Sequence, residues 1–414
     1  MPETTKKTDP ELLSPAGDKE SLAAAIGFGA DAVYIGGKRF GMRAAPKNFD
    51  FEQIADAVSM AHDKGVKLYL TCNTTPRNEE IQNLPNFLIN AAACGVDAFI
   101  IADLGVLSYA KKYAPGVSIH ISTQAGVANY AAACSLYELG AKRIVMAREV
   151  PLTDVAEIRR RIPEDMEIEC FVHGSMCVSY SGRCLISNYL ADRDSNRGDC
   201  AQPCRWKYRL VEETRPGEYL PVEEDADGTY IMNSRDMCMI EHIPALTDAG
   251  VNSFKIEGRA KSAYYTAVVT NAYRSAIDGW KACPSPDYKP KQWIVDELGK
   301  ISNREYCTGF YFDSPNRNAG IFFEGGYRRQ WEVAAVAENW EAGRLTAVQR
   351  NRFFENETLE ILEPGREPFE IKVEDLEDEE GHPIQSAPRA MMKVRFRCGQ
   401  SVQKGALLRK KTLL

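Results

Sequence analysis

Hydrophobic and polar positions follow a repeating unit along most of the chain. In each copy a helix-type segment ends at a glycine followed by a small or polar pair, and a short apolar run comes next, as in GFGADAVYIGG (27–37) and CGVDAFIIAD (94–103). Glycine can adopt the left-handed backbone conformation that ends a helix without a Cβ clash. The β-branched and aromatic residues of the apolar runs favour strands. The pattern therefore predicts alternating helices and strands.

Eight of the apolar runs qualify as strands. They are 11–15, 32–36, 67–73, 98–103, 118–124, 143–148, 167–172 and 253–257. Eight such strands, alternating with amphipathic helices, are typical of a (β/α)8 TIM-like barrel, an α/β fold. A doubly wound open sheet is the alternative, but the even count and the absence of a GxGxxG turn favour the barrel.

The repeat is interrupted once, between the seventh strand and the eighth. The insertion, residues 173–240, is rich in cysteine, and its segments KYRLVEE and GTYIMNS predict a hairpin. A long insertion after the carboxyl end of a barrel strand lies on the face that carries active sites. We therefore expect the insertion to lie over the barrel mouth.

The pattern changes after the barrel, which we assign to residues 11–280. Residues 281–330 begin with the Pro- and Lys-rich stretch KACPSPDYKPKQ and continue as a linker and helical connection. From residue 331 to residue 414 short strands alternate with turns every eight to twelve residues. This spacing is typical of a small antiparallel β-barrel domain, and no catalytic constellation is evident there.

Composition makes the chain an ordinary globular protein of two domains, with 414 residues, 44% hydrophobic and 26% charged. No apolar run approaches the roughly 20 residues of a membrane span, and no export signal is evident, so a cytoplasmic location without membrane contact is expected. In that compartment the twelve cysteines are expected to be thiols or metal ligands.

The net charge of −7 gives no overall attraction to nucleic acid, so any RNA-binding surface must be local. Two basic groups are candidates, and an ordinary solvated face is the alternative for each. The first lies beside the cysteines and comprises Arg193, Arg197, Arg205, Lys207 and Arg209. The second comprises Lys255, Arg259 and Lys261.

Polar residues follow the carboxyl ends of the predicted strands, where a barrel enzyme builds its site. They include Tyr34, Asn73, Asp103, Gln124, Arg148, Glu149, His173, Glu257 and Arg259. Some of them are expected only to cap helices or to form ion pairs. Arg148 and Arg259 are the strongest candidates for anion binding, because a guanidinium holds a carboxylate or phosphate at two points.

The cysteines of the insertion are spaced C-x6-C-x15-C-x3-C, and 33 residues separate the fourth from a fifth. They are Cys177, Cys184, Cys200, Cys204 and Cys238. A zinc ribbon would have close C-x2-C pairs, whereas an iron–sulfur cluster accepts thiolates from scattered loops. Buried free cysteine is the alternative and suits Cys72, Cys94, Cys134 and Cys170 better. Iron–sulfur is therefore favoured over zinc.

A hydrolase would need a nucleophile with a base. His173 lies close in sequence to Ser175 and Cys177, so a Cys–His arrangement stays open. No HExxH, GxSxG or Gly-rich phosphate loop occurs. The internal support for peptidase chemistry is weak.

Several segments together resemble the collagenase-like peptidase family U-thirty-two. They are ELLSPAG, AVYIGG, STQ, ARE, ECFVHGSMCVSYSGRCLIS, RGDCAQPCRW, NSRDMC and FKIEGR. The resemblance covers residues 11 to 280, and the region from residue 331 is similar to the small C-terminal domain of that family. Much of the family is associated with hydroxylation, of tRNA, of 23S ribosomal RNA or of ubiquinone precursors. The layout here resembles the tRNA branch most.

The resemblance implies formation of 5-hydroxyuridine at the tRNA wobble position, with prephenate as co-substrate and a [4Fe–4S] cluster as cofactor. It implies Cys177, Cys184, Cys200 and Cys238 as cluster ligands, with Cys204 as an alternative to Cys200. Catalytic residues would be Arg148, Glu149, His173, Glu257 and Arg259, and the two arginines would anchor prephenate. Substrate-binding residues would be Tyr34, Gln124, Arg197, Arg205 and Trp206. Partners would be tRNA and, as an open alternative, a related family member in a heteromer. Collagenase-like peptidase activity also stays open.

Overall fold

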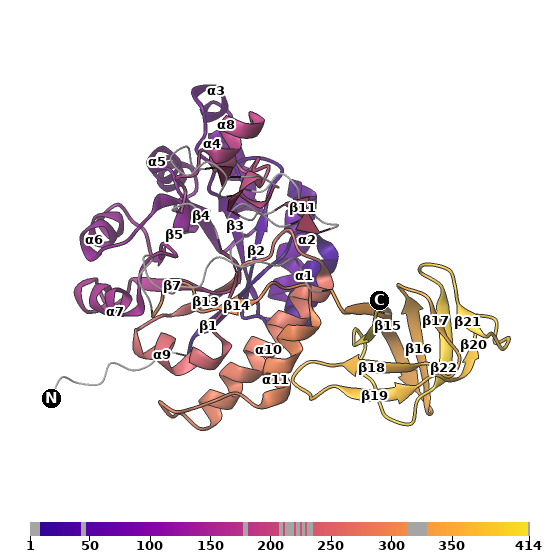
Figure 1. Ribbon diagram of the computed structural model, residues 1–414. Helices are drawn as coiled ribbons and strands as arrows, with labels where there is room; N and C mark the ends of the chain where they lie inside the picture. The colour runs from indigo at the N-terminus through magenta and orange to yellow at the C-terminus, as the bar shows by residue number, and fades with distance from the viewer. Residues whose placement is uncertain are drawn as a thin grey trace.

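Eight parallel strands close into a barrel at the centre of the larger domain (Figure 1). They are β1 (Glu11–Pro15), β2 (Ala32–Gly36), β3 (Lys67–Cys72), β4 (Ala98–Ile101), β5 (Ser118–Ile121), β6 (Arg143–Val145), β7 (Glu167–Ser175) and β13 (Ser253–Ile256). Each strand pairs with the next along the chain, and β13 closes the ring by pairing with both β7 and β1. The predicted (β/α)8 barrel is therefore confirmed.

The computed structural model describes residues 9–42, 47–176, 181–206, 210–211, 219–220, 224–225, 228–229, 235–312 and 329–412. Within the insertion it includes two short antiparallel pairs. They are β8 (Leu210–Val211) with β9 (Tyr219–Leu220), and β10 (Glu224–Asp225) with β11 (Gly228–Thr229).

Helices surround the barrel and carry the caps that their sequences provide. They are α1 (Lys19–Gly27), α2 (Phe51–His62), α3 (Asn78–Ile81), α4 (Leu84–Ala93), α5 (Leu104–Tyr113), α6 (Tyr130–Glu138), α7 (Leu152–Arg161), α9 (Ile243–Asp248) and α10 (Ala263–Ala282). Asp50 begins α2 with a capping box, and Asp103 begins α5 by accepting from Val106 N. Gly65 after α2 has φ +70°, the conformation expected from the repeat. No helix among the described residues is long and apolar enough to cross a membrane.

The inside of the barrel has a charged end and an apolar layer. Arg143 on β6 is buried and forms ion pairs with Glu11 (2.5 Å) and Glu169 (3.1 Å). The apolar layer consists of Leu13, Ala32, Tyr34, Tyr69, Ala98 and Ile100. Glu11 and Arg143 are the first residues of β1 and β6, so the ion pairs lie at the amino-terminal end of the barrel strands. The carboxyl ends face the other side.

Two short strands extend the barrel sheet beyond β7. β12 (Asp236–Cys238) runs antiparallel to β7, and β14 (Tyr306–Cys307) runs parallel to β12. The extension is held by Arg304, whose Nη2 lies 2.7 Å from Oδ1 of Asp236, with both side chains buried. Breaking such a pair leaves a buried charge without its partner, which is strongly destabilising. The position of Cys238 is fixed by this extension.

The C-terminal domain is a twisted antiparallel sheet with its own apolar core (Figure 1). Its strand order is β19 (Phe369–Lys372), β18 (Thr358–Leu362), β23 (Leu407–Lys411), β15 (Trp331–Glu341), β16 (Arg344–Gln349), β22 (Lys393–Arg397) and β20 (Glu374–Glu377). β17 (Phe353–Phe354) and β21 (Ser386–Ala387) form a separate pair. β19 and β20 lie at the two edges of this sheet and do not pair with each other. The small antiparallel β-barrel expected from the sequence is therefore an open half-barrel.

Buried charges join the two domains. Arg409 on β23 is fully buried, and its Nη2 lies 2.6 Å from Oε1 of Glu297 at the end of α11 (Gln292–Glu297). Its Nε donates to Glu360 on β18 at 2.8 Å, and Lys300 also pairs with Glu360 at 2.8 Å. Leu362 and Leu407 join the apolar core of the barrel domain. The half-barrel is thus held against the connection that follows α10.

Candidate active site at the barrel mouth

A cavity of about 180 Å³ opens where the barrel strands end. Its lining comes from the ends of the strands and from the insertion. From the strands come Tyr34, Thr71, Asn73, Ile100, Ser122, Thr123, Gln124, Arg148, Phe171, Lys255, Glu257 and Arg259. From the insertion come Ser181, Gly182, Cys184, Ile186, Ser195, Asn196, Cys200, Pro203 and Cys204. The insertion therefore covers the mouth of the barrel, as its place after the seventh strand led us to expect.

Arg259 is held at one side of the cavity by close packing. Its Nη1 donates to Oγ1 of Thr71 at 2.7 Å, and the residue is buried. Gly36 at the end of β2 makes room for it, because a Cβ at that position would lie 2.4 Å from Nη1. The glycine of the AVYIGG segment thus allows a guanidinium to lie directly against the backbone.

Arg148 lies on another part of the same wall. Its Nη1 donates to the carbonyl of Ser175 at 2.8 Å, and its guanidinium carbon lies 4.0 Å from the ring centroid of Phe171. Its Nε is buried and has no hydrogen-bond partner among the described residues. Two guanidinium groups in one small cavity can bind a dianionic ligand.

Lys255 brings a third positive group to the cavity. Its Nζ donates to Oε1 of Glu169 at 2.6 Å, and Oε2 of Glu169 accepts from Arg143 at 3.1 Å. Burial lowers the pKa of Lys255, while Glu169 acts against that shift. We grouped Lys255 with surface cations in the sequence, although a lysine inside the apolar run SFKIE was a signal that it faces the barrel interior.

Backbone contacts fix the first part of the insertion on the barrel. Glu149 accepts from the backbone N–H of Ser181 at 2.9 Å and from its hydroxyl at 3.1 Å. Gly182 has φ +74°, and a Cβ there would lie 2.3 Å from the carbonyl oxygen of Gln124. Glu149, predicted as catalytic, therefore anchors the loop in this structure, and Asp103 caps α5.

Three cysteines of the insertion reach the cavity, namely Cys184, Cys200 and Cys204. Sγ of Cys200 accepts from the backbone N–H of Gln202 at 3.3 Å. Ser195 and Asn196 both donate to the carbonyl of Cys184, at 2.7 and 2.9 Å. Cysteine sulfurs on one loop suit iron–sulfur binding, in which each cysteine binds a different iron and the sulfurs need not meet at one point.

The other two predicted ligands are placed differently. Cys177 lies outside the described residues. Cys238 is on β12, and its Sγ lies 3.9 Å from the hydroxyl of Tyr273. Cys238 is not among the described residues that line the cavity. Burial raises the pKa of Cys238 to about 11. The ligand set Cys177, Cys184, Cys200 and Cys238, with Cys204 as the alternative to Cys200, therefore stays a prediction.

His173 is enclosed by aromatic rings and does not line the cavity. The ring centroids of Tyr306, Tyr273 and Tyr265 lie 5.3, 5.6 and 6.0 Å from that of His173. The side chain is buried, and desolvation lowers its pKa to about 3. A general base must reach its substrate and accept a proton near neutral pH. The geometry therefore does not favour His173 in that role.

Of the residues predicted to bind the substrate, Tyr34 and Gln124 line the cavity, and Arg197 and Trp206 belong to the insertion. Arg197 forms a two-point ion pair with Glu80 on α3, at 2.8 and 2.9 Å. Trp206 is partly exposed. The side chain of Arg205 and residues 207–209 lie outside what the structure describes. Sequence reasoning missed Tyr189 on α8 (Ile186–Ala191), which is 81% exposed and close in sequence to the cavity-lining Ile186.

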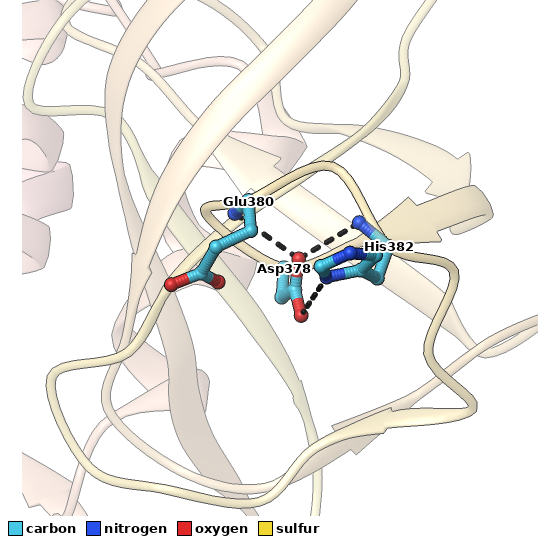
Figure 2. A group of neighbouring side chains, drawn as sticks. All are labelled: Asp378, Glu380 and His382. Atoms are coloured by element: carbon cyan, nitrogen blue, oxygen red, sulfur yellow. Dashed lines mark hydrogen bonds and ion pairs between the residues drawn. The ribbon is translucent and has the colours of Figure 1, made fainter.

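A separate group on the C-terminal domain brings ligand-type atoms close together. Asp378, Glu380 and His382 lie in the turn after β20 (Figure 2). Asp378 accepts from the backbone N–H groups of Glu380 (3.1 Å) and His382 (2.8 Å). These bonds within the turn account for the arrangement without a metal.

Comparisons with known proteins cover nearly the whole chain. The model of peptidase family U32 matches residues 17–320, and the model of the family's C-terminal domain matches residues 329–409. The tRNA hydroxylation protein P1 of Bacillus subtilis is 36% identical over 98% of this chain and 95% of its own length. The tRNA hydroxylation protein P of Escherichia coli is 34% identical, over 92% of this chain and 91% of its own. A collagenase of Porphyromonas gingivalis is 35% identical over 73% of each chain.

Proposed function

Because this chain belongs to peptidase family U32, and because tRNA hydroxylation proteins match it over both domains, we propose that it hydroxylates tRNA. The product would be 5-hydroxyuridine at the wobble position, with prephenate as co-substrate. The observation that carries the proposal is the match to the Bacillus subtilis protein over 98% of this chain, C-terminal domain included. The collagenase match covers only 73%.

The cavity supports the choice of a small anionic co-substrate. Arg148 and Arg259 would each bind a carboxylate of prephenate, and the Phe171 ring beside Arg148 would contact its hydrocarbon ring. Tyr34 already donates its hydroxyl to the carbonyl of Ile256, so its ring rather than its hydroxyl faces bound molecules. With a volume of about 180 Å³, the cavity suits a small acid together with part of a nucleobase better than a peptide chain.

The cofactor would be a [4Fe–4S] cluster held by the insertion. Cys184, Cys200 and Cys204 are the described candidates, and Cys177 and Cys238 are those implied by the family pattern. When bound, such a cluster would supply one-electron chemistry next to the two arginines. Gln202 would keep its N–H bond to Sγ of Cys200, and the anchored loop would exclude water from the cavity floor.

An RNA substrate would approach over the insertion. Trp206 and Tyr189 are aromatic residues on which an unpaired base could stack. Stacking on these residues would leave the uridine ring over the cavity lined by Gln124 and Ser122. Partnership with a related family member is a further part of the proposal, tested by co-purification of a second, similar chain.

The decisive experiment measures the wobble modification directly. Transfer RNA from a strain that lacks the gene is digested and analysed by mass spectrometry for 5-hydroxyuridine. We expect the nucleoside to disappear and to return with the wild-type gene but not with Arg259→Met, while the exposed-surface control Arg397→Met restores it. Unchanged 5-hydroxyuridine in the deletion strain would refute the proposal.

Cluster binding needs its own measurement, because hydroxylation could survive without it. Anaerobically purified protein is expected to contain close to four irons and four sulfides per chain, the stoichiometry of about one cube. Separate Cys184→Ser, Cys204→Ser and Cys238→Ser variants then identify the ligands by loss of iron. Colourless, iron-free protein that still restores hydroxylation would contradict the cofactor assignment.

Collagenase-like peptidase activity is the second candidate, favoured only by the Porphyromonas gingivalis relative. It would require a Cys–His pair, and His173 is enclosed by three tyrosines away from the cavity. A gelatin-cleavage assay with Cys177→Ala as the control decides it. If metal-free wild-type protein cleaved gelatin and Cys177→Ala did not, the result would support peptidase activity in place of tRNA hydroxylation.

A further inference from the structure

Lys255 is a buried lysine that nevertheless reaches the cavity. It lines the cavity, and only 4% of the residue is exposed. Its Nζ lies 4.6 Å from the ring centroid of Tyr34 and 5.5 Å from that of Phe171. Lysines are almost never buried unless paired, because removing an ammonium from water is costly. An amine held here is protected from bulk water and open only to a molecule bound in the cavity.

Glu169 provides a place for the proton of that amine. Its Oε1 accepts from Nζ at 2.6 Å, and the carboxylate is fully buried. Its other oxygen keeps a bond to Arg143 at 3.1 Å, so the carboxylate stays oriented whether or not Lys255 is protonated. Desolvation favours the neutral, nucleophilic form of a lysine, and Glu169 is placed to receive the proton that this form gives up.

Arg148 lies where a carboxylate next to the reacting carbonyl would bind. Its guanidinium contacts the same Phe171 ring as Lys255, with the guanidinium carbon 4.0 Å from the centroid. Its buried Nε lacks a hydrogen-bond partner among the described residues, which leaves a donor for the ligand. A 2-oxo acid has its carboxylate directly bonded to its carbonyl carbon. Such a molecule offers a carboxylate to Arg148 and a carbonyl carbon to Lys255, which line the same cavity.

We propose that Lys255 forms an imine with a 2-oxo acid whose carboxylate is bound by Arg148. The lone pair of Nζ, freed when Glu169 takes the proton, attacks the carbonyl carbon and forms the C–N bond. The carbonyl oxygen takes one proton back from Glu169 and a second one from the attacking nitrogen, and it leaves as water, so ammonium and ketone give protonated imine and water with no oxidant or reductant. The protonated imine keeps its positive charge beside Glu169.

The inference rests on the proposed function for its biological role, because prephenate carries a 2-oxo acid side chain. It assigns the attachment point of that co-substrate, and it explains why the cavity contains a lysine in addition to two arginines. A purely structural Lys255–Glu169 ion pair is the competing explanation. The two differ in one observable, a covalent adduct.

Borohydride trapping tests the imine in the full-length protein. The chain is incubated with phenylpyruvate, reduced with sodium borohydride, and measured by intact mass and peptide mapping. We expect a gain equal to the acid less one oxygen atom, on the peptide that contains Lys255. Lys255→Arg keeps a charge beside Glu169 but has no primary amine, so it should lose the adduct, whereas the control Lys261→Arg should retain it.

Two results with the wild-type protein overturn the imine, and they do not depend on a variant folding. One is the absence of a mass gain in wild-type protein, and the other is a gain spread over other lysines and not concentrated on Lys255. The tRNA assay separates the two proposals. Full 5-hydroxyuridine with Lys255→Arg would overturn the imine and leave the hydroxylase standing. An adduct on Lys255 together with unchanged 5-hydroxyuridine in the deletion strain would support the imine and refute the hydroxylase.

Discussion

The guanidinium of Arg259 lies so close to Gly36 that a Cβ at that glycine would be 2.4 Å from Nη1. The guanidinium that follows β13 is therefore positioned by the end of β2, on a different part of the barrel. Such contacts between strand ends are the means by which a closed barrel assembles a site from distant segments.

Gly36→Ala should displace Arg259 and weaken anion binding. Loss of one hydrogen bond to a charged group corresponds to about 1.5 kcal/mol, or roughly tenfold in affinity. Isothermal titration calorimetry with phenylpyruvate measures the change. Gly27→Ala is the matched control, because a Cβ at Gly27 meets nothing within 4 Å. Equal affinities for the two variants would show that Arg259 does not bind the acid.

Gly182→Ala should disturb the loop that carries the cysteines. Its φ of +74° is unfavourable for alanine, and the new Cβ would lie 2.3 Å from the carbonyl of Gln124. We expect lower iron content in anaerobically purified protein. Gly343 has a similar φ of +80°, but a Cβ there would meet nothing within 4 Å. Gly343→Ala therefore shows the effect of backbone strain alone, without the steric clash expected at Gly182. Wild-type iron content in Gly182→Ala would contradict the expected displacement.

Acid should weaken the barrel through Glu11. Burial raises the pKa of Glu11, but the charge and hydrogen bonds of Arg143 outweigh it, and the net pKa lies below 4.5. A group whose pKa is depressed on folding stabilises the protein above its unfolded pKa, and this contribution is lost as pH falls through the folded value. The difference in unfolding free energy between wild type and Glu11→Gln should therefore shrink from pH 6 to about pH 3.

Urea unfolding at successive pH values measures this difference. The exposed Glu79→Gln serves as the control and should follow the wild type throughout. If the difference in unfolding free energy between wild type and Glu11→Gln stayed constant from pH 6 to about pH 3, the charge of Glu11 would not contribute to stability through its pair with Arg143.

Arg409→Met should loosen the contact between the domains. It leaves Glu297 and Glu360 without the guanidinium that is fully buried between them, and removing one partner of a buried pair costs about 3–5 kcal/mol. Differential scanning calorimetry should resolve separate transitions for the two domains. Arg397→Met, at a side chain that is 63% exposed, should cost less than about 1 kcal/mol. A single unshifted transition in Arg409→Met would contradict the assignment.

Arg197 has two possible roles, holding the insertion on α3 and binding an RNA phosphate, and tRNA binding by variants distinguishes them. Its guanidinium is held at two points by Glu80, so its charge is already neutralised locally. If the pair only fixes the insertion on α3, Arg197→Ala and Glu80→Ala should weaken tRNA binding equally. If Arg197 contacts phosphate, Glu80→Ala should strengthen binding and Arg197→Ala should weaken it. Fluorescence anisotropy with tRNA at fixed salt distinguishes the two outcomes.

Local periodicity was sufficient to predict the barrel. The bounds of β1 and β2 agree with the apolar runs at 11–15 and 32–36, because those runs are buried on both faces and end at glycine or proline-containing turns. The strand β7 runs three residues beyond its predicted end. Its extra residues pair with β12, a contact between segments about sixty residues apart that no local pattern contains.

The candidate site was partly predictable for the same reason. Once a barrel is inferred, the carboxyl ends of its strands must converge, and Tyr34, Gln124, Arg148, Glu257 and Arg259 do line one cavity. The side-chain direction at His173 was not predictable. The register between β7 and β13 shifts between Lys255 and Ile256, which skips Val172, and such an irregularity changes which face the following residues occupy.

The sequence by itself determined the strand count, the place of the insertion and the set of residues at the strand ends, because these depend on periodicity and chain order. The tertiary structure decided which of these residues lie close to one another. It brought Cys184, Cys200 and Cys204 to the cavity and Cys238 to Tyr273, and it paired Lys255 with Glu169 inside the barrel. These outcomes depend on register and on packing between distant segments, which residue order alone does not specify.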